Sequence, residues 1–234
     1  MLTNINNALL SKNITCEYQA VIQCGDRRSY YYEALARQRI GFEKSETLFN
    51  AIKWITNGKI LGHLTQSIFW QTYKTFAHRE EDFALNIPVH VFLDKYSYHS
   101  IESMIRNMDI GKRVIFEIVI EEWIEHLALI SPLIQKLKEY GVRFAVDGFG
   151  SGKMMFHDLK LLHIDIIKVE GILFKSWIEL QWGETVVGQI VEFARMHNMT
   201  TIAKEIDSPF AYQKAYQMGM DCMQGFYIHR PCEL

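Results

Sequence analysis

The sequence predicts an α/β fold, a TIM-like (β/α)8 barrel with an antiparallel first strand and a shortened C-terminal helix. Short apolar segments alternate with amphipathic helical segments along most of the chain, which favours a mostly parallel sheet. About eight such strands fit into this length, which favours closure into a barrel, and a hairpin opens the series. The 234 residues, 49% of them hydrophobic, can bury one large core, so we expect a single domain over residues 1–234.

The expected strands come at regular intervals. Ile14–Gln23 and Ser29–Leu35 flank the segment Cys24–Arg28, whose Gly and Asp residues favour a turn, so these two strands form a hairpin. Because a hairpin reverses the chain, the first strand runs antiparallel to the second. The remaining strands are expected at residues 83–87, 114–119, 142–146, 164–169, 199–203 and 221–228.

Amphipathic helices are expected between the strands. Ile130, Leu133, Ile134 and Leu137 recur at helical spacing, and Gly141 ends that helix. A short stub, residues 229–234, follows the last expected strand, so we expect the final helix of the barrel to be missing or shortened. The other helices are expected near residues 46–56 and at 61–77, 101–108, 186–194 and 210–218.

The composition excludes several classes of protein. The formal net charge is −2 and the pI is near 6.5, so nothing in the bulk charge favours binding to nucleic acid. Cys16, Cys24, Cys222 and Cys232 show no CxxC spacing, which suits a reducing compartment. Charged residues interrupt every apolar run, and the first residues lack the layout of a signal peptide. We therefore expect a soluble, cytoplasmic protein without a direct role at a membrane.

Polar residues gather where the expected strands end, and in a barrel these positions line one mouth. These polar residues would form a cup at the mouth, and their spacing in the sequence does not decide between two interpretations of it. The carboxylates could be oxygen ligands gathered for Mg²⁺ or Mn²⁺, or the cup could be a self-neutralised network of ion pairs. The residues are Glu33, Arg37, Asn86, Glu117, Asp147, Lys168, Glu170, Lys204, Glu205 and Gln224.

Short motifs in a fixed order identify a family resemblance. Glu33-Ala34-Leu35-Ala36-Arg37 matches ExLxR, and seven further segments match in order and spacing, with Arg230-Pro231 as a trailing RP. The chain therefore resembles the EAL domain family of cyclic-di-GMP phosphodiesterases over about residues 14–231. The seven segments are Tyr18-Gln19, Leu85-Asn86, Phe116–Ile118, Phe144–Gly152, Ile167–Glu170, Ile202–Ser208 and Met223–Phe226.

The resemblance implies a site that has lost part of its chemistry. In active members, two divalent cations clamp the scissile phosphate and generate a hydroxide. Gly148 replaces an acidic ligand, Glu170 is one methylene longer than the family's Asp, and Lys204 replaces a Glu. The positions that match the family's functional residues are Glu33, Asn86, Glu117 and Asp147 as metal ligands, Lys168 near the catalytic water, and Gln224 as the late glutamine.

Lys204 decides between the two interpretations of the cup. An ammonium where a carboxylate should meet Mg²⁺ gives a repulsion of about 4 kcal/mol per unit charge pair at 4 Å and an effective dielectric near 20. We therefore expect Lys204 to pair with Glu33, Glu117 or Asp147, and we expect no bound metal and no cofactor, only a vestigial Mg²⁺/Mn²⁺ site. Glu205 should point to the opposite side, since neighbouring strand residues alternate. The chain is expected not to be an active enzyme.

Three functions follow from the resemblance, and the leading one is regulation through binding to another protein. Short, degenerate, single-domain EAL proteins of enteric bacteria bind the flagellar master transcription regulator and repress motility, which supplies a concrete partner by analogy. Exposed apolar residues would form the docking patch. The first alternative is a cyclic-di-GMP receptor without catalysis, with Arg37, Gln19 and Asp207 as candidate nucleotide-binding residues. The second alternative is a weak cyclic-di-GMP phosphodiesterase.

Overall fold

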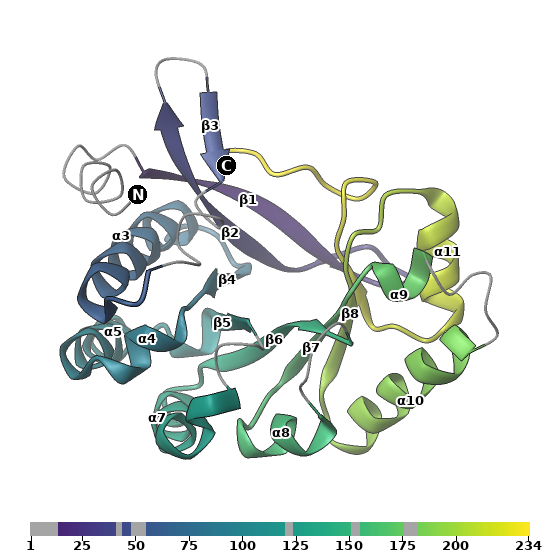
Figure 1. Cartoon of the computed structure of the whole chain (residues 1–234). Helices are drawn as coiled ribbons and strands as arrows, with labels where there is room; N and C mark the ends of the chain where they lie inside the picture. Colours follow the sequence, from purple (N-terminus) through teal and green to yellow (C-terminus); the bar gives the residue numbers. More distant parts are fainter. Residues whose placement is uncertain (1–13, 41–43, 48–54, 120–123, 151–154, 176–181) are drawn as a thin grey trace.

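The computed structural model describes residues 14–40, 44–47, 55–119, 124–150, 155–175 and 182–234, and within them one sheet closes into a barrel (Figure 1). Its order is β1-β9-β8-β7-β6-β5-β4-β2, and an antiparallel pairing of β1 with β2 closes it. β1 is also antiparallel to β9, and the other pairs around the barrel are parallel. The barrel strands are β1 (Ile14–Gln23), β2 (Ser29–Ile40), β4 (Asp82–Asn86), β5 (Val114–Val119), β6 (Arg143–Phe149), β7 (Ile166–Val169), β8 (Thr200–Ala203) and β9 (Cys222–Met223).

The helices cover the outside of this barrel (Figure 1). Asn57 caps the start of α3, where its side chain accepts hydrogen bonds from the backbone N–H groups of residues 59 and 60, and Ser208 caps α11, whose first residue is a proline. None of the helices in the described residues is long and apolar enough to cross a membrane. The α-helices are α3 (Gly58–Phe76), α4 (Val89–Leu93), α5 (Lys95–Met108), α7 (Leu127–Glu139), α8 (Phe156–Leu161), α9 (Ile172–Lys175), α10 (Trp182–Met196) and α11 (Pro209–Gln217), with 3-10 turns η1 (Gly111–Arg113) and η2 (Ile124–His126).

The inside of the barrel contains an apolar layer to which every barrel strand contributes one buried residue. These residues are almost completely shielded from solvent, and they form a cluster separate from the larger core between the barrel and its helices. They therefore fill the barrel as a packed layer, as expected for a closed barrel of this size. The apolar layer consists of Val21, Tyr31, Ala84, Ile115, Ala145, Ile166, Ile202 and Cys222.

Two predicted elements are wrong or shorter than expected. The helix near 46–56 is not formed in its described part, because β3 (Lys44–Thr47) pairs with the far end of β2 and residues 55–57 are not helical; residues 48–54 lie outside the described residues. The last strand ends at Met223 rather than at residue 228. The chain turns at Gly225, where an added Cβ would lie 2.1 Å from the carbonyl oxygen of Ile206, so only glycine fits there.

The segment after β9 takes the place of the expected final helix. Residues 224–234 contain no helix and run antiparallel beside β1 at one point, where Tyr18 and Cys232 exchange backbone hydrogen bonds of 2.7 and 3.2 Å. The Tyr18 hydroxyl also donates to Thr75 of α3 at 3.1 Å. α3 therefore packs against β1, and the C-terminal segment pairs with the edge of β1.

Candidate functional site

A layer of polar side chains lies directly above the apolar layer, on the side of the barrel mouth. Side chains at i and i+2 of a strand point to the same side, so the residues two positions nearer the mouth also face the barrel axis. In β1, which runs in the opposite direction, that position comes two residues earlier in the sequence. The polar layer consists of Gln19, Glu33, Asn86, Glu117, Asp147, Lys168, Lys204 and Gln224. The structure therefore brings eight residues singled out from the sequence into one ring, with three carboxylates, two ammonium groups and three amides.

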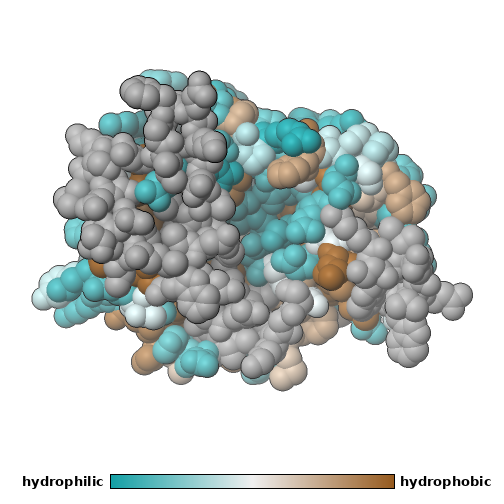
Figure 2. Space-filling model, turned by 45° about the horizontal axis from the view of Figure 1, so that its top comes forward, coloured by the Kyte–Doolittle hydropathy of each residue, from teal (hydrophilic) through white to brown (hydrophobic). Residues whose placement is uncertain are grey.

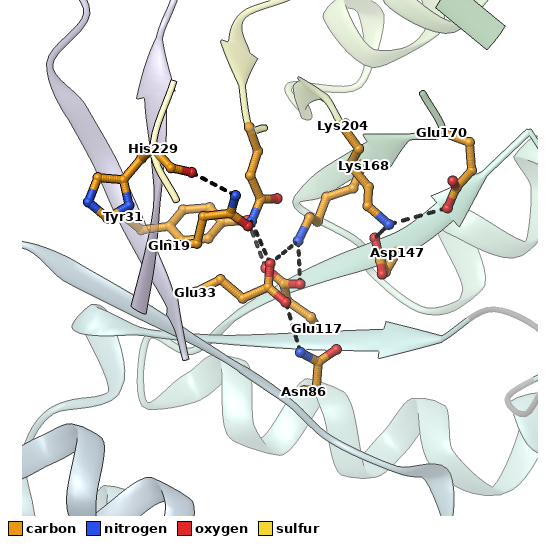
Figure 3. Close-up of polar contacts among 11 residues, drawn as sticks. Gln19, Tyr31, Glu33, Asn86, Glu117, Asp147, Lys168, Glu170, Lys204 and His229 are labelled. Atoms are coloured by element: carbon orange, nitrogen blue, oxygen red, sulfur yellow. Dashed lines mark hydrogen bonds and ion pairs between the residues drawn. The ribbon is translucent and has the colours of Figure 1, made fainter. Parts of the chain in front are cut away.

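Lys168 binds two carboxylates at the centre of this layer (Figure 3). Its ammonium donates to Glu117 at 2.5 Å and to Glu33 at 2.9 Å, and its side chain is completely buried. Glu33 also accepts hydrogen bonds from the amides of Asn86 at 2.9 Å and Gln224 at 2.7 Å. Each buried charge thus has a partner, which is the condition under which buried ions are tolerated.

Two buried acids share this one ammonium, and their pKa values move apart. Burial by itself would raise the pKa of Glu33, but Lys168 and the amide hydrogen bonds outweigh it and hold that pKa well below its ordinary value. Burial raises the pKa of Glu117, and the nearby Glu33 carboxylate adds to the rise. Burial would lower the pKa of Lys168, but the carboxylates of Glu117 and Glu33 raise it. Lys168 is therefore a permanent cation, and Glu117 is the acid that holds a proton more readily.

Lys204 forms a second group of ion pairs nearer the opening. Its ammonium lies 2.7 Å from Asp147 and 3.2 Å from Glu170, and the Lys204 and Asp147 side chains are about one-fifth exposed (20% and 19%; Figure 3). Burial would lower the pKa of Lys204, but Asp147 raises it. The expected ion pair of Lys204 is therefore present, and Asp147 is the partner among the three candidates. Glu170, at the end of β7, is a further partner that was not expected.

Two residues of the network were not predicted. Tyr31, in the apolar layer, donates its hydroxyl to Glu117 at 2.9 Å, and burial followed by the charge of Glu117 raises the pKa of Tyr31. Counting two residues back from Glu33 along the strand would have placed Tyr31 directly below the site. The backbone carbonyl of His229 accepts from the amide of Gln19 at 2.9 Å, a contact of the C-terminal segment that no local pattern indicates.

The mouth opens into a cavity of about 440 Å³. Figure 2 shows hydrophilic surface gathered in a hollow of this face, with hydrophobic atoms at part of its edge. The expectation for Glu205 is wrong: β8 ends at Ala203 and Glu205 has a φ of +54°, so the alternation of a strand no longer applies and its side chain lines the same cavity as Lys204. The lining residues include Glu33, Asp147, Lys204 and Gln224, together with Glu205, Asp207 and Phe226.

The candidate nucleotide-binding residues separate into two groups. Gln19 and Asp207 line the cavity. Arg37 lies further along β2 and does not belong to that lining; its guanidinium donates to Glu17 of β1 at 2.8 Å. Arg37 is therefore held in an ion pair with its own chain.

The polar layer contains carboxylate oxygens of the kind that bind metal ions, but these carboxylates are already paired with lysines. Glu33, Glu117 and Asp147 each have a lysine ammonium as a direct partner. In the part of the chain that the structure describes, no group of three or more His, Cys, Asp or Glu side chains has the arrangement to hold a metal ion. Gly148, where the family resemblance implies an acidic ligand, has a φ of +82° and carries no side chain at all.

Two curated proteins illustrate the sequence similarity of this chain to known proteins. Cyclic di-GMP phosphodiesterase PdeF of Escherichia coli (strain K12) is 24% identical over 173 residues, which are 74% of this chain and 23% of PdeF. Cyclic di-GMP phosphodiesterase PdeA of Borreliella burgdorferi is 25% identical over 162 residues, which are 68% of this chain and 24% of PdeA. The chain thus spans about a quarter of the length of these curated relatives.

The solved structures and the family models agree with this similarity. The EAL domain of FimX from Pseudomonas aeruginosa, bound to c-di-GMP, superposes with a TM-score of 0.88 at 16% identity, over 99% of this chain and 96% of that chain. This likeness concerns the fold, the barrel with its antiparallel first strand. The model of the EAL domain matches residues 3–231. With a match over nearly its whole length, the chain belongs to the EAL domain family.

Proposed function

We propose that this chain is a catalytically inactive EAL domain that regulates by binding another protein. The observation that supports this most directly is the position of the Lys204 ammonium, 2.7 Å from Asp147 and 3.2 Å from Glu170. Phosphodiester hydrolysis by two metal ions needs open carboxylate oxygens on both metals. Here the Lys204 ammonium is paired with the carboxylate oxygens of Asp147 and Glu170, so the residues present do not fit a pair of divalent cations.

The energy of this arrangement also favours lysine over metal. A divalent ion that entered beside Asp147 would meet the Lys204 ammonium, and the repulsion per unit charge pair is about 4 kcal/mol at 4 Å with an effective dielectric near 20. The longer side chain of Glu170 points its carboxylate at the same ammonium. We therefore propose that Lys168 and Lys204 together supply the positive charge of the layer and that the Mg²⁺/Mn²⁺ site is vestigial.

The partner that we propose is the flagellar master transcription regulator, with repression of motility as the outcome. This partner is proposed from the resemblance to short degenerate EAL proteins. The geometry of the polar layer supports a role in binding without hydrolysis. Exposed aromatic side chains offer contact area, with Tyr96 at 78% and Phe210 at 61% exposure.

A second candidate is binding of cyclic-di-GMP without hydrolysis. It is favoured by the FimX EAL domain, which was solved bound to c-di-GMP, and by the cavity at the same mouth. One feature weighs against it, because Arg37 is already held in an ion pair with Glu17.

A calorimetric titration tests these functions together. The purified chain is titrated with cyclic-di-GMP in the presence of Mn²⁺, the mixture is then chromatographed for linear product, and an active EAL phosphodiesterase serves as the positive control. We expect neither heat nor product. Heat without product would replace our proposal with the receptor, and sustained formation of product would show an active enzyme. Capture of the purified flagellar regulator on the immobilised chain then tests the partner, and failure of capture would remove it.

A further inference from the structure

A short segment, residues 229–234, lies along one edge of β1, and we call it the C-terminal latch. β9 pairs with this edge at the end of β1 that leads into the hairpin turn, whereas nearer the mouth Tyr18 exchanges backbone hydrogen bonds of 2.7 and 3.2 Å with Cys232 of the latch. Arg230 and residues 232–234 are exposed. Hydrogen bonds rather than apolar burial therefore hold the latch, which is typical of segments that open at low cost.

One of these hydrogen bonds depends on the protonation of His229. The backbone N–H of Ala20 in β1 donates to Nδ1 of His229 at 3.3 Å. Nδ1 is thus an acceptor, so the neutral imidazole carries its proton on Nε2, which lies 3.8 Å from the Sγ of Cys232. A second proton has to go to Nδ1, where it would point at the N–H of Ala20. The imidazolium therefore cannot make this contact with β1.

The surroundings of His229 offer the imidazolium no compensating partner. In the described part of the chain its ring has contacts with Ala20, Tyr32 and Cys232, none of which is a carboxylate; the ring of Tyr32 meets it edge-on, with centroids 6.1 Å apart. Glu17 is held in its ion pair with Arg37. The titratable and charged groups of the elements around His229 are Glu17 and Tyr18 of β1, Tyr32 and Glu33 of β2, Lys74 and His78 of α3, and Arg230, Cys232 and Glu233 of the latch.

The latch is also connected to the polar layer of the mouth. The amide nitrogen of Gln19 donates to the backbone carbonyl of His229 at 2.9 Å, and the amide oxygen of Gln19 accepts from Gln224 at 3.2 Å (Figure 3). Gln224 in turn donates to Glu33 at 2.7 Å. If the latch leaves β1, the buried amide of Gln19 loses an acceptor, which is unfavourable. The state of the latch and the order of the polar layer are therefore coupled through one side chain.

We propose that protonation of His229 releases the C-terminal latch from β1, which makes this segment an acid-sensitive strap. The latch is bound while Nδ1 accepts from Ala20, and it is released when the ring becomes an imidazolium. Histidine suits this role because it is the side chain that changes charge between about pH 5 and 8. Release uncovers the backbone N–H and C=O of Tyr18, so the edge of β1 is open below the transition and covered above it.

Hydrogen exchange measured by NMR tests the release at single amides. Protection is the ratio of the exchange rate of an unstructured amide to the observed rate, both at the same pH. Between about pH 7.5 and about pH 5.5, we expect protection at Tyr18, Ala20 and Cys232 to fall at least about tenfold, the factor for about 1.4 kcal/mol. The reference is the amide of Asp165, which donates to the carbonyl of Phe144 at 2.9 Å on another part of the barrel and should keep its protection.

Two variants of His229 separate protonation from other effects of pH. In His229→Asn the side-chain oxygen can replace Nδ1 as an acceptor but takes up no proton, so protection should stay high and change by less than about twofold between the two pH values. In His229→Phe the ring has no acceptor, so protection at Ala20 should be low at both pH values. The control is His157→Asn, an exposed histidine of α8, which should respond to pH as the wild-type chain does.

Three results would overturn the inference. The first is a wild-type chain whose latch amides keep their protection at the lower pH. The second is an equal fall at Asp165, since the barrel rather than the latch would then be opening. The third is a tenfold fall that persists in His229→Asn or His229→Phe, because a group other than His229 would then cause it. Circular dichroism checks that every variant is folded.

Discussion

Replacing Lys204 with methionine would test whether this lysine holds the mouth together. Methionine keeps most of the volume of the lysine stem but removes the ammonium. Asp147 and Glu170 would then face each other without their shared cation, and the acids below them would add to the repulsion. The variant should therefore fold less stably, although no apolar contact of the core is lost.

The magnitude follows from the burial of the pair. Deleting one member of a buried ion pair costs about 3–5 kcal/mol, whereas exposed pairs contribute about 0–1 kcal/mol. The Lys204 and Asp147 side chains are 20% and 19% exposed, so the pair is nearer to the buried case, and partial solvent screening reduces the cost. We expect a loss of about 2–3 kcal/mol in the free energy of unfolding, which for a chain of this size lowers Tm by about 4–12 °C.

Urea unfolding followed by circular dichroism measures this loss, with Lys160→Met on α8 as the matched control. Lys160 is exposed, so its replacement should change the free energy of unfolding by no more than about 0.5 kcal/mol. Added Mg²⁺ should stabilise Lys204→Met more than the wild-type chain, because the released carboxylates become available to a cation. A Lys204→Met chain as stable as the wild type, with no response to Mg²⁺, would refute the idea that this lysine replaces the metal.

Two further predictions concern the same layer. The folded chain keeps the Glu117 proton to higher pH than the unfolded chain does, because burial raises the pKa of Glu117. The free energy of unfolding should therefore fall as pH rises above about 4.5. Glu117→Gln should flatten that fall, as measured by urea unfolding between about pH 5 and 8. If the free energy of unfolding of Glu117→Gln varied with pH as that of the wild-type chain does, Glu117 would not be the cause of the pH dependence. Gly148→Asp with Lys204→Glu should gain Mn²⁺ affinity by calorimetry without gaining hydrolysis, since Glu170 keeps its extra methylene; hydrolysis by this variant would mean that Gly148 and Lys204 alone block activity.

The barrel could be predicted from the sequence because its signal is local and repeated. Several short apolar strands, such as Val114–Val119, are followed by a helix with its own periodicity, and alternation in this length leaves few other folds. The helix expected near residues 46–56 failed for a non-local reason. Residues 44–47 pair with the end of β2, and no pattern within those four residues reports that pairing. The short helices α8 and α9 have too few residues to show a helical period.

The sequence predicted which residues form the candidate site, but not which of them form ion pairs with one another. The motifs named all eight residues of the polar layer, and in the structure each lies two positions along the chain from a residue of the apolar layer. The choice of Asp147 as the partner of Lys204 depends on which strands are neighbours around the closed barrel, and the sequence does not give distances across it. Glu205 was misplaced because the strand alternation was carried on to residue 205, whereas β8 ends at Ala203 and Glu205 has a φ of +54°.

The apolar layer beneath the site also governs how fast its protons exchange with solvent. One buried side chain from each barrel strand closes the interior below Lys168 and Glu117, so among the described residues the mouth is the side from which water approaches these groups. Hydrogen exchange of the Lys168 ammonium and of the Tyr31 hydroxyl then requires other side chains of the polar layer to move. A molecule seated in the mouth would slow that exchange further, so the lifetime of these two protons would report occupancy even where no signal arises from the ligand itself.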